Sequence, residues 1–283
     1  MRHPRGGPPV PLFLWAQLSR PAAAAFDGCT AVPLTPATGS FLRRGGCPRI
    51  GPVIPHAVDT RVFRTDGTVG AGGASKSSLG LGDSLVIGAV GANSRRKRFD
   101  LVIRSFALAA RRLARRHRSA LLLIKTDRTV SLDGIDLHRL AEQEGVSGSV
   151  RFITNMMTPA NLARLYSAMD IFINLSEWEG FGIPVVEAMA CGLPVVTHGI
   201  QGPGEILPYR ETIAGGSTVR EESGTRLLEA DPQETAGLLT ALAEGPELRI
   251  RLSTAGRYEA ESVYDVRIVL LKWEQLIAGE GIA

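Results

Sequence analysis

The sequence predicts an α/β protein with a Rossmann-like parallel sheet and helices on both faces. Three observations lead to this prediction. Short, continuous apolar runs such as Leu85–Val90 are typical of strands that are buried on both faces. Amphipathic segments of helical period separate these runs, and the two kinds of segment alternate from Ser84 to Thr197. This order favours parallel strands joined by helical crossovers.

The individual elements follow from apolar spacing and from capping residues. In Asp100–Arg116, apolar residues recur at steps of three and four, which indicates a helix. In Pro159–Met169, the proline occupies the first turn behind Thr158, a suitable N-cap. The expected strands are Leu85–Val90, Ala120–Ile124, Val150–Ile153, Ile171–Leu175 and Pro194–Thr197. The remaining expected helices are Gly134–Glu144, Pro184–Cys191, Pro232–Glu244, Glu247–Glu261 and Val266–Ala278.

Composition narrows the range of functions. The chain has 283 residues, of which 44% are hydrophobic and 21% charged, as is ordinary for a globular protein. A net charge of +4 fits an anionic small ligand or surface and does not call for nucleic acid. No apolar stretch approaches the roughly 20 residues of a membrane-spanning helix. The three cysteines have no metal-type spacing, so we expect a cytoplasmic protein.

The most informative segment is the acidic, glycine-containing stretch from Ser176 to Val196. It lies between an expected buried strand and an expected helix. Gly180 and Gly182 allow the backbone to bend and to approach a ligand closely. The free N–H groups at the helix start suit a phosphate. Glu179 and Glu187 are hydroxyl acceptors rather than phosphate ligands, so the segment predicts a site for a diphosphate flanked by sugars. The alternative is that both are surface or helix-dipole charges.

Two basic clusters differ in their expected roles. The first, Asn93–Asp100, follows the first strand and opens a helix, so its cations are well placed to stabilise a pyrophosphate. A solvated basic turn is the alternative. The second, Arg111–Arg118, lies at a helix C-terminus and is expected to be a solvated face. A contact with acidic lipid headgroups is its alternative, and the absence of interleaved aromatic residues argues against nucleic acid.

The spacing of Glu179 and Glu187 resembles the Glu-x7-Glu signature of retaining glycosyltransferases with the GT-B fold, in the group 1 family. The resemblance covers roughly Val53 to Ile277. It includes Val53–Phe63, which is similar to the stretch joining the two domains of such enzymes, and Pro203–Glu205, which is similar to a short Gly/Pro-Glu turn. His56, within the joining stretch, is expected to be structural, whereas His198 is a weaker candidate for lining the cleft.

The resemblance implies roles for individual residues. Glu179 would contact the donor sugar as a catalytic residue, and Glu187 would contact the nucleotide ribose. The backbone at Gly180, Phe181, Gly182 and Ile183 would face the diphosphate or the sugar. Lys97 matches the family's lysine before a helix. The family's arginine lies five residues earlier, where this chain has Ala92; Arg96 or Arg95 takes that place, and we prefer Arg96. The family implies no metal and no cofactor, with the nucleotide-diphosphate sugar as donor substrate.

The resemblance also implies a domain plan. Residues 1–52 would be a remnant of a truncated acceptor domain, with a final helix near Thr35–Arg43. Residues 53–83 would be a linker with a glycine-rich loop, 84–262 the nucleotide-sugar-binding domain, and 263–283 a crossover helix. The predicted function is transfer of a sugar from a UDP- or GDP-sugar to a carbohydrate or lipid-linked acceptor. The alternatives are a non-catalytic nucleotide-sugar-binding module, half of a split enzyme that needs a separate N-terminal chain, or an epimerase or phosphorylase of the same fold. Peripheral membrane contact is a further expectation.

Overall fold

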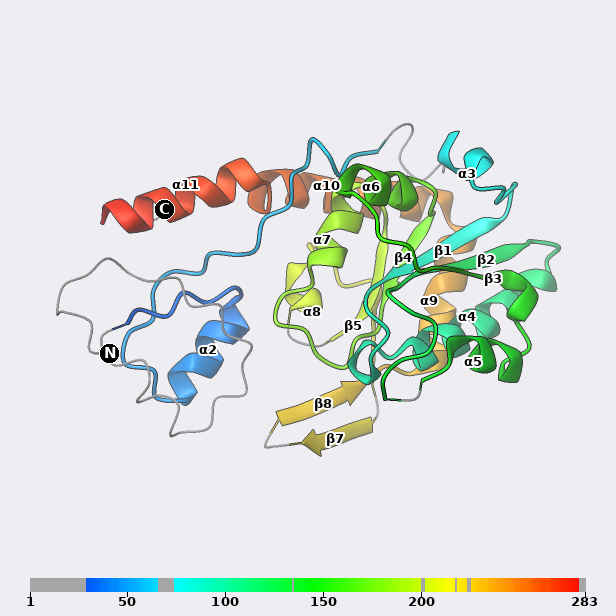
Figure 1. The fold of residues 1–283 in the computed structure, drawn as a ribbon, viewed down its shortest axis with the longest axis horizontal. Helices are drawn as coiled ribbons and strands as arrows, with labels where there is room; N and C mark the ends of the chain where they lie inside the picture. Colours follow the sequence, from blue (N-terminus) through cyan, green and yellow to red (C-terminus); the bar gives the residue numbers. More distant parts are fainter. Residues whose placement is uncertain are drawn as a thin grey trace.

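The computed structural model describes residues 29–65, 74–133, 135–199, 202–216, 218–222 and 225–279. Its centre is a six-stranded parallel sheet in the order β3-β2-β1-β4-β5-β6 (Figure 1). The strands are β1 (Leu85–Val90), β2 (Ala120–Lys125), β3 (Val150–Ile153), β4 (Ile171–Asn174), β5 (Val195–His198) and β6 (Ile213–Ala214). The predicted Rossmann-like parallel sheet is therefore confirmed.

Helices cover both faces of the sheet, as expected (Figure 1). On one face α4 packs against α5 and α9, and on the other α7 packs against α6 and α10. The core between these layers is largely apolar, and Phe106 and Phe172 are fully buried in it. The helices are α4 (Phe99–Ala114), α5 (Leu137–Gln143), α6 (Pro159–Ser167), α7 (Ile183–Ala190), α8 (Pro203–Ile206), α9 (Pro232–Glu244), α10 (Pro246–Val263) and α11 (Val266–Ala278).

Local sequence explains several of the observed boundaries. Thr158 and Asp231 cap α6 and α9, because their side-chain oxygens accept hydrogen bonds from backbone N–H groups of the first turn. The predicted helix at 134–144 begins later, at Leu137, because Asp136 caps it by accepting from the N–H groups of His138 and Arg139. In β1, a side chain at position 88 would require Met169 to move, since a Cβ there would lie 1.9 Å from the Met169 sulfur.

A small N-terminal unit lies beside the α/β domain (Figure 1). Its helix α2 (Pro36–Arg44) is capped by Thr35, close to the helix expected there. An extended segment leads from this unit to the domain, and α11 runs back from the domain above the unit (Figure 1). Only Val269 of α11 is buried, and Leu270, Leu271 and Ile277 are exposed.

Some elements were not foreseen. The glycine-rich stretch 66–83 was expected to be a loop; residues 66–73 lie outside the described part, but α3 (Ala74–Ser78) is helical. Lys76 anchors this helix by pairing with Asp170 at 2.6 Å. The antiparallel hairpin of β7 (Thr218–Glu222) and β8 (Thr225–Glu229) was also missed. The domain boundaries themselves stay predictions.

Candidate donor site at the carboxyl edge of the sheet

The candidate site lies where the sheet order reverses. From β1 the chain proceeds to β2 and β3 on one side, whereas β4, β5 and β6 follow on the other. The connections after β1 and β4 therefore diverge, which opens a crevice at the carboxyl ends of these neighbouring strands. The short 3-10 helix η2 (Arg95–Lys97) follows β1. Residues 175–182, which we call the acidic loop, follow β4 and lead into α7.

Glu179 of the acidic loop is held by two cations from η2. Its Oε2 lies 2.8 Å from Nη1 of Arg96, and its Oε1 pairs with Nζ of Lys97. The hydroxyl of Ser176 donates a further hydrogen bond to Oε1 at 2.9 Å. Burial of Glu179 raises its pKa, but the charges of Lys97 and Arg96 outweigh that effect and hold the pKa below its ordinary value. Glu179 is thus a charged carboxylate beside two cations.

Arg96 also joins η2 to the acidic loop. Its guanidinium donates to the carbonyl of Trp178 at 2.9 Å and lies 5.0 Å from the centroid of the Trp178 ring. The backbone N–H of Glu177 donates to the carbonyl of Arg96 at 2.7 Å. The side chain of Arg95 is exposed instead. Of the two arginines considered from the sequence, Arg96 is the one that contacts Glu179.

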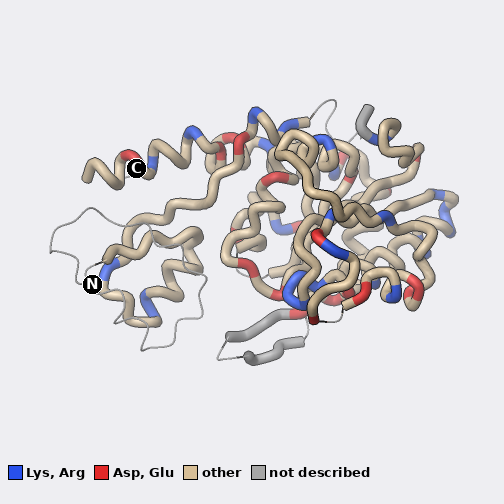
Figure 2. The backbone as a smooth tube through the Cα atoms, in the orientation of Figure 1, with Lys and Arg blue, Asp and Glu red and all other residues tan. Residues whose placement is uncertain are grey.

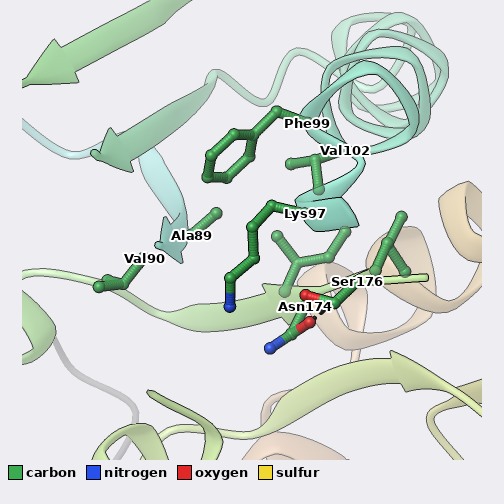
Figure 3. Close-up of a pocket in the computed structure, with 9 residues that line it drawn as sticks. Ala89, Val90, Lys97, Phe99, Val102, Asn174 and Ser176 are labelled. Carbon is green, nitrogen blue, oxygen red and sulfur yellow. Dashed lines mark hydrogen bonds between the residues drawn. The ribbon is translucent and has the colours of Figure 1, made fainter. Parts of the chain in front are cut away.

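Lys97 reaches across the crevice from η2 towards β4. Figure 3 shows its side chain extending past Ala89 of β1 towards Asn174, which ends β4, and Ser176 of the acidic loop. These residues line a small pocket together with Val90, Phe99 and Val102 of β1 and α4. The ammonium group therefore lies at the carboxyl edge, where a bound anion would meet it.

Glu187 occupies a different environment. It lies in the second turn of α7, and its Oε2 accepts a hydrogen bond of 2.8 Å from the hydroxyl of Tyr166. Burial raises the pKa of Glu187, and the Tyr166 hydrogen bond opposes this rise only in part. The described structure shows no cation paired with Glu187. The two carboxylates of the motif are thus placed near one strand end but in opposite electrostatic settings.

The residues between them shape the turn into α7. Gly182 is the N-cap of α7 and has φ of 107°, a value that favours glycine. Phe181 is buried, whereas Ile183 is partly exposed at the start of the helix. Gly180 has open space around its α-carbon. The predicted donor-contacting backbone at Gly180, Phe181, Gly182 and Ile183 is therefore one continuous turn beside Glu179.

Sequence analysis missed the supporting role of Ser176 and ranked His198 low. His198, at the end of β5, is fully buried, and its Nε2 lies 2.7 Å from the carbonyl of Ser176. Asn174 accepts from the N–H of Ser176 through its Oδ1 at 3.0 Å. These polar side chains follow directly after buried strands, and that position is the signal in the sequence that indicates them.

The second basic run is largely exposed, as expected for a solvated face, and several of its arginines also contact the protein. Arg116 pairs with Glu244 at 2.5 Å, Arg118 donates to the carbonyl of Ala243 at 2.7 Å, and Arg112 donates to Gln233 at 2.7 Å. These contacts join the end of α4 to both ends of α9. Figure 2 shows the charged residues distributed over the tube. A contact of this run with lipid headgroups stays a prediction.

Two features of the described residues bear on the class of site. No three of their His, Cys, Asp and Glu side chains are grouped so that they could hold a metal ion. None of their helices combines the length and the apolar character that crossing a bilayer requires. The expectations of a metal-free site and of a cytoplasmic location stay predictions.

Comparison with known proteins gives the family. The model of the family described as glycosyl transferases group 1 matches residues 74–258, which is more than half of the chain. The chain belongs to this family. The D-inositol 3-phosphate glycosyltransferase of Thermomonospora curvata is 30% identical over 220 residues, covering 76% of this chain and 48% of the relative. For the corresponding protein of Corynebacterium urealyticum, the identity is 30% over 245 residues, covering 83% and 54%.

The chain thus spans about half the length of the curated relatives that it matches. Solved structures share its fold. Sucrose-phosphate synthase from Thermosynechococcus elongatus matches with a TM-score of 0.73 at 19% identity, over 91% of this chain and 60% of its own. Anabaena HepE in complex with UDP and glucose matches with a TM-score of 0.72 at 17% identity, over 93% and 68%.

A third structure matches the domain alone. The C-terminal domain of a glycosyl transferase group 1 family protein, LpcC from Francisella tularensis, matches over 74% of this chain and 99% of its own. The TM-score is 0.59 at 20% identity. The α/β domain described above therefore has the fold of a C-terminal domain of this family.

Proposed function

We propose that the crevice between β1 and β4 binds a nucleotide-diphosphate sugar and that the protein acts in retaining glycosyl transfer. The observation that carries the proposal is the cluster of Arg96, Lys97 and Glu179 at the carboxyl ends of two neighbouring strands. Two cations beside a sugar-binding carboxylate match a ligand that has a diphosphate next to a hydroxylated ring. Membership of the group 1 family supports the same ligand class.

In this proposal the cations change partner when the donor binds. In the described structure Arg96 and Lys97 neutralise Glu179, and both are mostly buried, with side chains 20% and 10% exposed. A diphosphate entering the crevice would compete for them, leaving Glu179 free to accept from sugar hydroxyls. The same cations then stabilise the charge that develops on the departing diphosphate. Arg96 and Lys97 are therefore the proposed catalytic residues that stabilise the leaving group.

The two carboxylates divide recognition of the donor. Glu179 lies beside the cations and therefore near the sugar–phosphate bond, so we assign it to the sugar. Glu187 lies deeper along α7, and its Oε1, unlike its Oε2, is not used by Tyr166. We assign Glu187 to the ribose hydroxyls. The turn from Gly180 to Ile183 supplies backbone N–H groups to the phosphates.

Retention would follow from a front-face displacement. The bond between the anomeric carbon and the phosphate oxygen breaks, and the acceptor hydroxyl attacks the same face of the sugar. The acceptor's proton passes to the departing phosphate oxygen. No step in this scheme requires Glu179 to act as a nucleophile.

Donor and acceptor identities are guided by similar proteins. HepE is described in complex with UDP and glucose, so UDP-glucose is the first donor to test, with GDP-sugars as the second class. The relatives are named D-inositol 3-phosphate glycosyltransferases, so D-inositol 3-phosphate is the first acceptor. A lipid-linked or other carbohydrate acceptor is the next class.

Calorimetric titration of the full chain with UDP, GDP and their sugars tests the proposal. We expect saturable binding of at least one of them, and no binding of any by the folded protein would overturn the proposal. Product analysis with donor and acceptor then separates the alternatives. Transfer or donor hydrolysis supports an enzyme, whereas donor binding without either supports a non-catalytic module or half of a split enzyme. Retention is read from the anomeric configuration of the product.

A further inference from the structure

Phe181 of the acidic loop contacts both segments that join the α/β domain to the rest of the chain. Its ring centroid lies 5.3 Å from that of His56, with the rings at 84°. The Phe181 ring centroid also lies 5.7 Å from the ring centroid of Tyr264, with the two rings at 74°. Both are edge-to-face contacts, a favourable geometry for aromatic pairs. His56 belongs to the segment that arrives from the N-terminal unit, and Tyr264 ends α10 just before α11.

The two joining segments are tied to each other next to Phe181. The N–H of Val58 donates to the carbonyl of Tyr264 at 2.9 Å, and the N–H of Val266 donates to the carbonyl of Val58 at 3.1 Å. The hydroxyl of Thr60 donates to the buried carboxylate of Asp265 at 2.5 Å. We call residues 56–60 and 264–266 the hinge pair. Because these hydrogen bonds join the two segments to each other, a shift of one segment would move the other.

A second contact connects the N-terminal unit to the same loop. The N–H of Ala37, in the first turn of α2, donates to Oε2 of Glu205 in α8 at 3.0 Å. Gly202, which caps α8, packs so closely on the acidic loop that a Cβ there would lie 2.6 Å from the carbonyl oxygen of Phe181. Phe181 is therefore connected to the N-terminal segments at its ring, through His56, and at its backbone, through Gly202 and α8.

We propose that His56 and Tyr264 are positioning residues that couple the placement of the hinge pair to the phosphate-facing turn of the acidic loop through Phe181. This inference rests on the proposed function, because it needs a donor at that turn. The ring contacts of His56 and Tyr264 described above are both made with Phe181. They act by holding the ring next to Gly182, whose positive φ sets the direction of the turn.

The coupling has two measurable consequences. If the ring contacts order the turn, then removing one lowers the fraction of molecules whose loop is competent to bind, and the apparent dissociation constant rises by the same factor. An aromatic pair of this kind is worth roughly a three- to tenfold change in an equilibrium. Coupling is also reciprocal, so a ligand at the turn must order the hinge pair.

The chain contains a matched control. His138 of α5 makes a similar edge contact with Phe152 of β3, with centroids 4.6 Å apart and rings at 66°. This pair lies on the opposite side of β1 from the acidic loop, beyond β2. Replacing His138 removes a histidine–phenylalanine contact without touching the loop or the hinge pair.

The experiment compares wild type, His56→Ala, His56→Phe, Tyr264→Leu and His138→Ala by calorimetry with UDP and GDP. We expect His56→Ala and Tyr264→Leu to weaken nucleotide binding roughly three- to tenfold. His56→Phe keeps an aromatic edge and restores most of the affinity, and His138→Ala leaves it unchanged. In a cycle with Phe181→Leu, the effect of His56→Ala disappears, whereas His138→Ala leaves affinity unchanged in both backgrounds.

Hydrogen exchange supplies the second measurement. Nucleotide should slow exchange of the Val58 and Val266 amides, which lie in the hinge pair, and His56→Ala should abolish that protection. If wild type binds nucleotide but His56→Ala binds it equally well and the hinge amides are unaffected, the coupling is wrong. If wild type binds no nucleotide, the proposed function itself fails. Equal losses in His56→Ala and His138→Ala would indicate a general effect on folding and would also overturn the coupling.

Discussion

The acidic loop and helix α7 each present one carboxylate of the same motif, yet the two differ in almost every physical respect. Glu179 is paired with two cations and a hydroxyl, which keep its pKa low. Glu187 accepts a hydrogen bond from a tyrosine hydroxyl, and burial raises its pKa. These settings fit the different roles that the proposed function gives to the two residues. In that proposal, Glu179 gives up its two cations to the diphosphate, and Glu187 accepts hydrogen bonds from ribose hydroxyls.

The largest expected effect is on turnover, and it should distinguish Glu179 from Glu187. Glu179→Ala should lower kcat about 100-fold, because misplacing the sugar relative to the leaving group costs that much in related settings. Its effect on KM should be smaller. Steady-state kinetics with the donor identified by calorimetry measure both constants, and Glu142→Ala, an exposed residue of α5, is the control. A variant with unchanged kcat would remove Glu179 from the chemical step.

The next effect is on donor affinity. Glu187→Ala should weaken donor binding about tenfold or more, since hydrogen bonds to a charged acceptor contribute about 1.5–3 kcal/mol each. Calorimetry with the intact donor gives the dissociation constant directly. Should Glu187→Ala bind donor as tightly as wild type, the ribose assignment is wrong.

A smaller effect is expected on stability, and its sign differs between the two sites. Burial raises the pKa of Glu187 in the folded state, so the charged carboxylate destabilises the fold above that pKa. Glu187→Gln should therefore raise Tm near neutral pH, and the gain should fade as the pH drops through that raised pKa. The low pKa of Glu179 means that its charge stabilises the fold above the unfolded value.

Glu179→Gln should accordingly lower Tm near neutral pH, because it lowers the free energy of unfolding by an amount on the order of 1–3 kcal/mol when the two partly buried cations lose their partner. This loss should shrink as the pH falls through the folded-state pKa of Glu179. Thermal unfolding of both glutamine variants across pH measures the contrast. Shifts of the same sign in both variants would contradict the electrostatic difference between the sites.

The smallest effect concerns the pH dependence of donor binding. The Tyr166 hydroxyl bonds to Glu187 and favours its charged form, so Tyr166→Phe should raise the pKa of Glu187 further. Donor affinity should then be lost at a higher pH than in wild type as the solution is acidified. The comparison requires calorimetry over a pH series, with Glu187→Gln as the variant that lacks this titration. Identical profiles for wild type and Tyr166→Phe would show that the hydroxyl does not tune the site.

Periodicity and capping residues were sufficient to predict the parallel sheet and most of its helices. Buried runs such as Ile171–Leu175 carry a clear signal because both faces of the strand are covered. The hairpin β7–β8 was missed because its sequence lacks a continuous apolar run, as in Thr218–Glu222. The helix α3 was missed because the surrounding glycines indicate a loop, whereas the Lys76–Asp170 pair that anchors it joins residues far apart in sequence.

At the site, the sequence indicated which residues lie at the same edge of the sheet, but not which of them form ion pairs with one another. The positions of Lys97 and Glu179 after β1 and β4 place them at one edge of the sheet. The choice between Arg95 and Arg96 needed the conformation of η2, since neighbouring side chains on this helix point in different directions. The contact of His56 with Phe181 could not be predicted, because it joins residues 125 positions apart through tertiary packing alone.

The central claim is that two cations and two unlike carboxylates form a nucleotide-diphosphate-sugar site. Calorimetric titration of wild type, Glu179→Gln and Glu187→Gln with the nucleoside diphosphate alone tests it most directly. Without a sugar, Glu179 offers the ligand nothing and competes for Arg96 and Lys97. Glu179→Gln is therefore expected to bind the nucleotide as well as wild type or more tightly, and Glu187→Gln to bind it more weakly. Equal weakening in both variants, or no binding by wild type, would contradict the account.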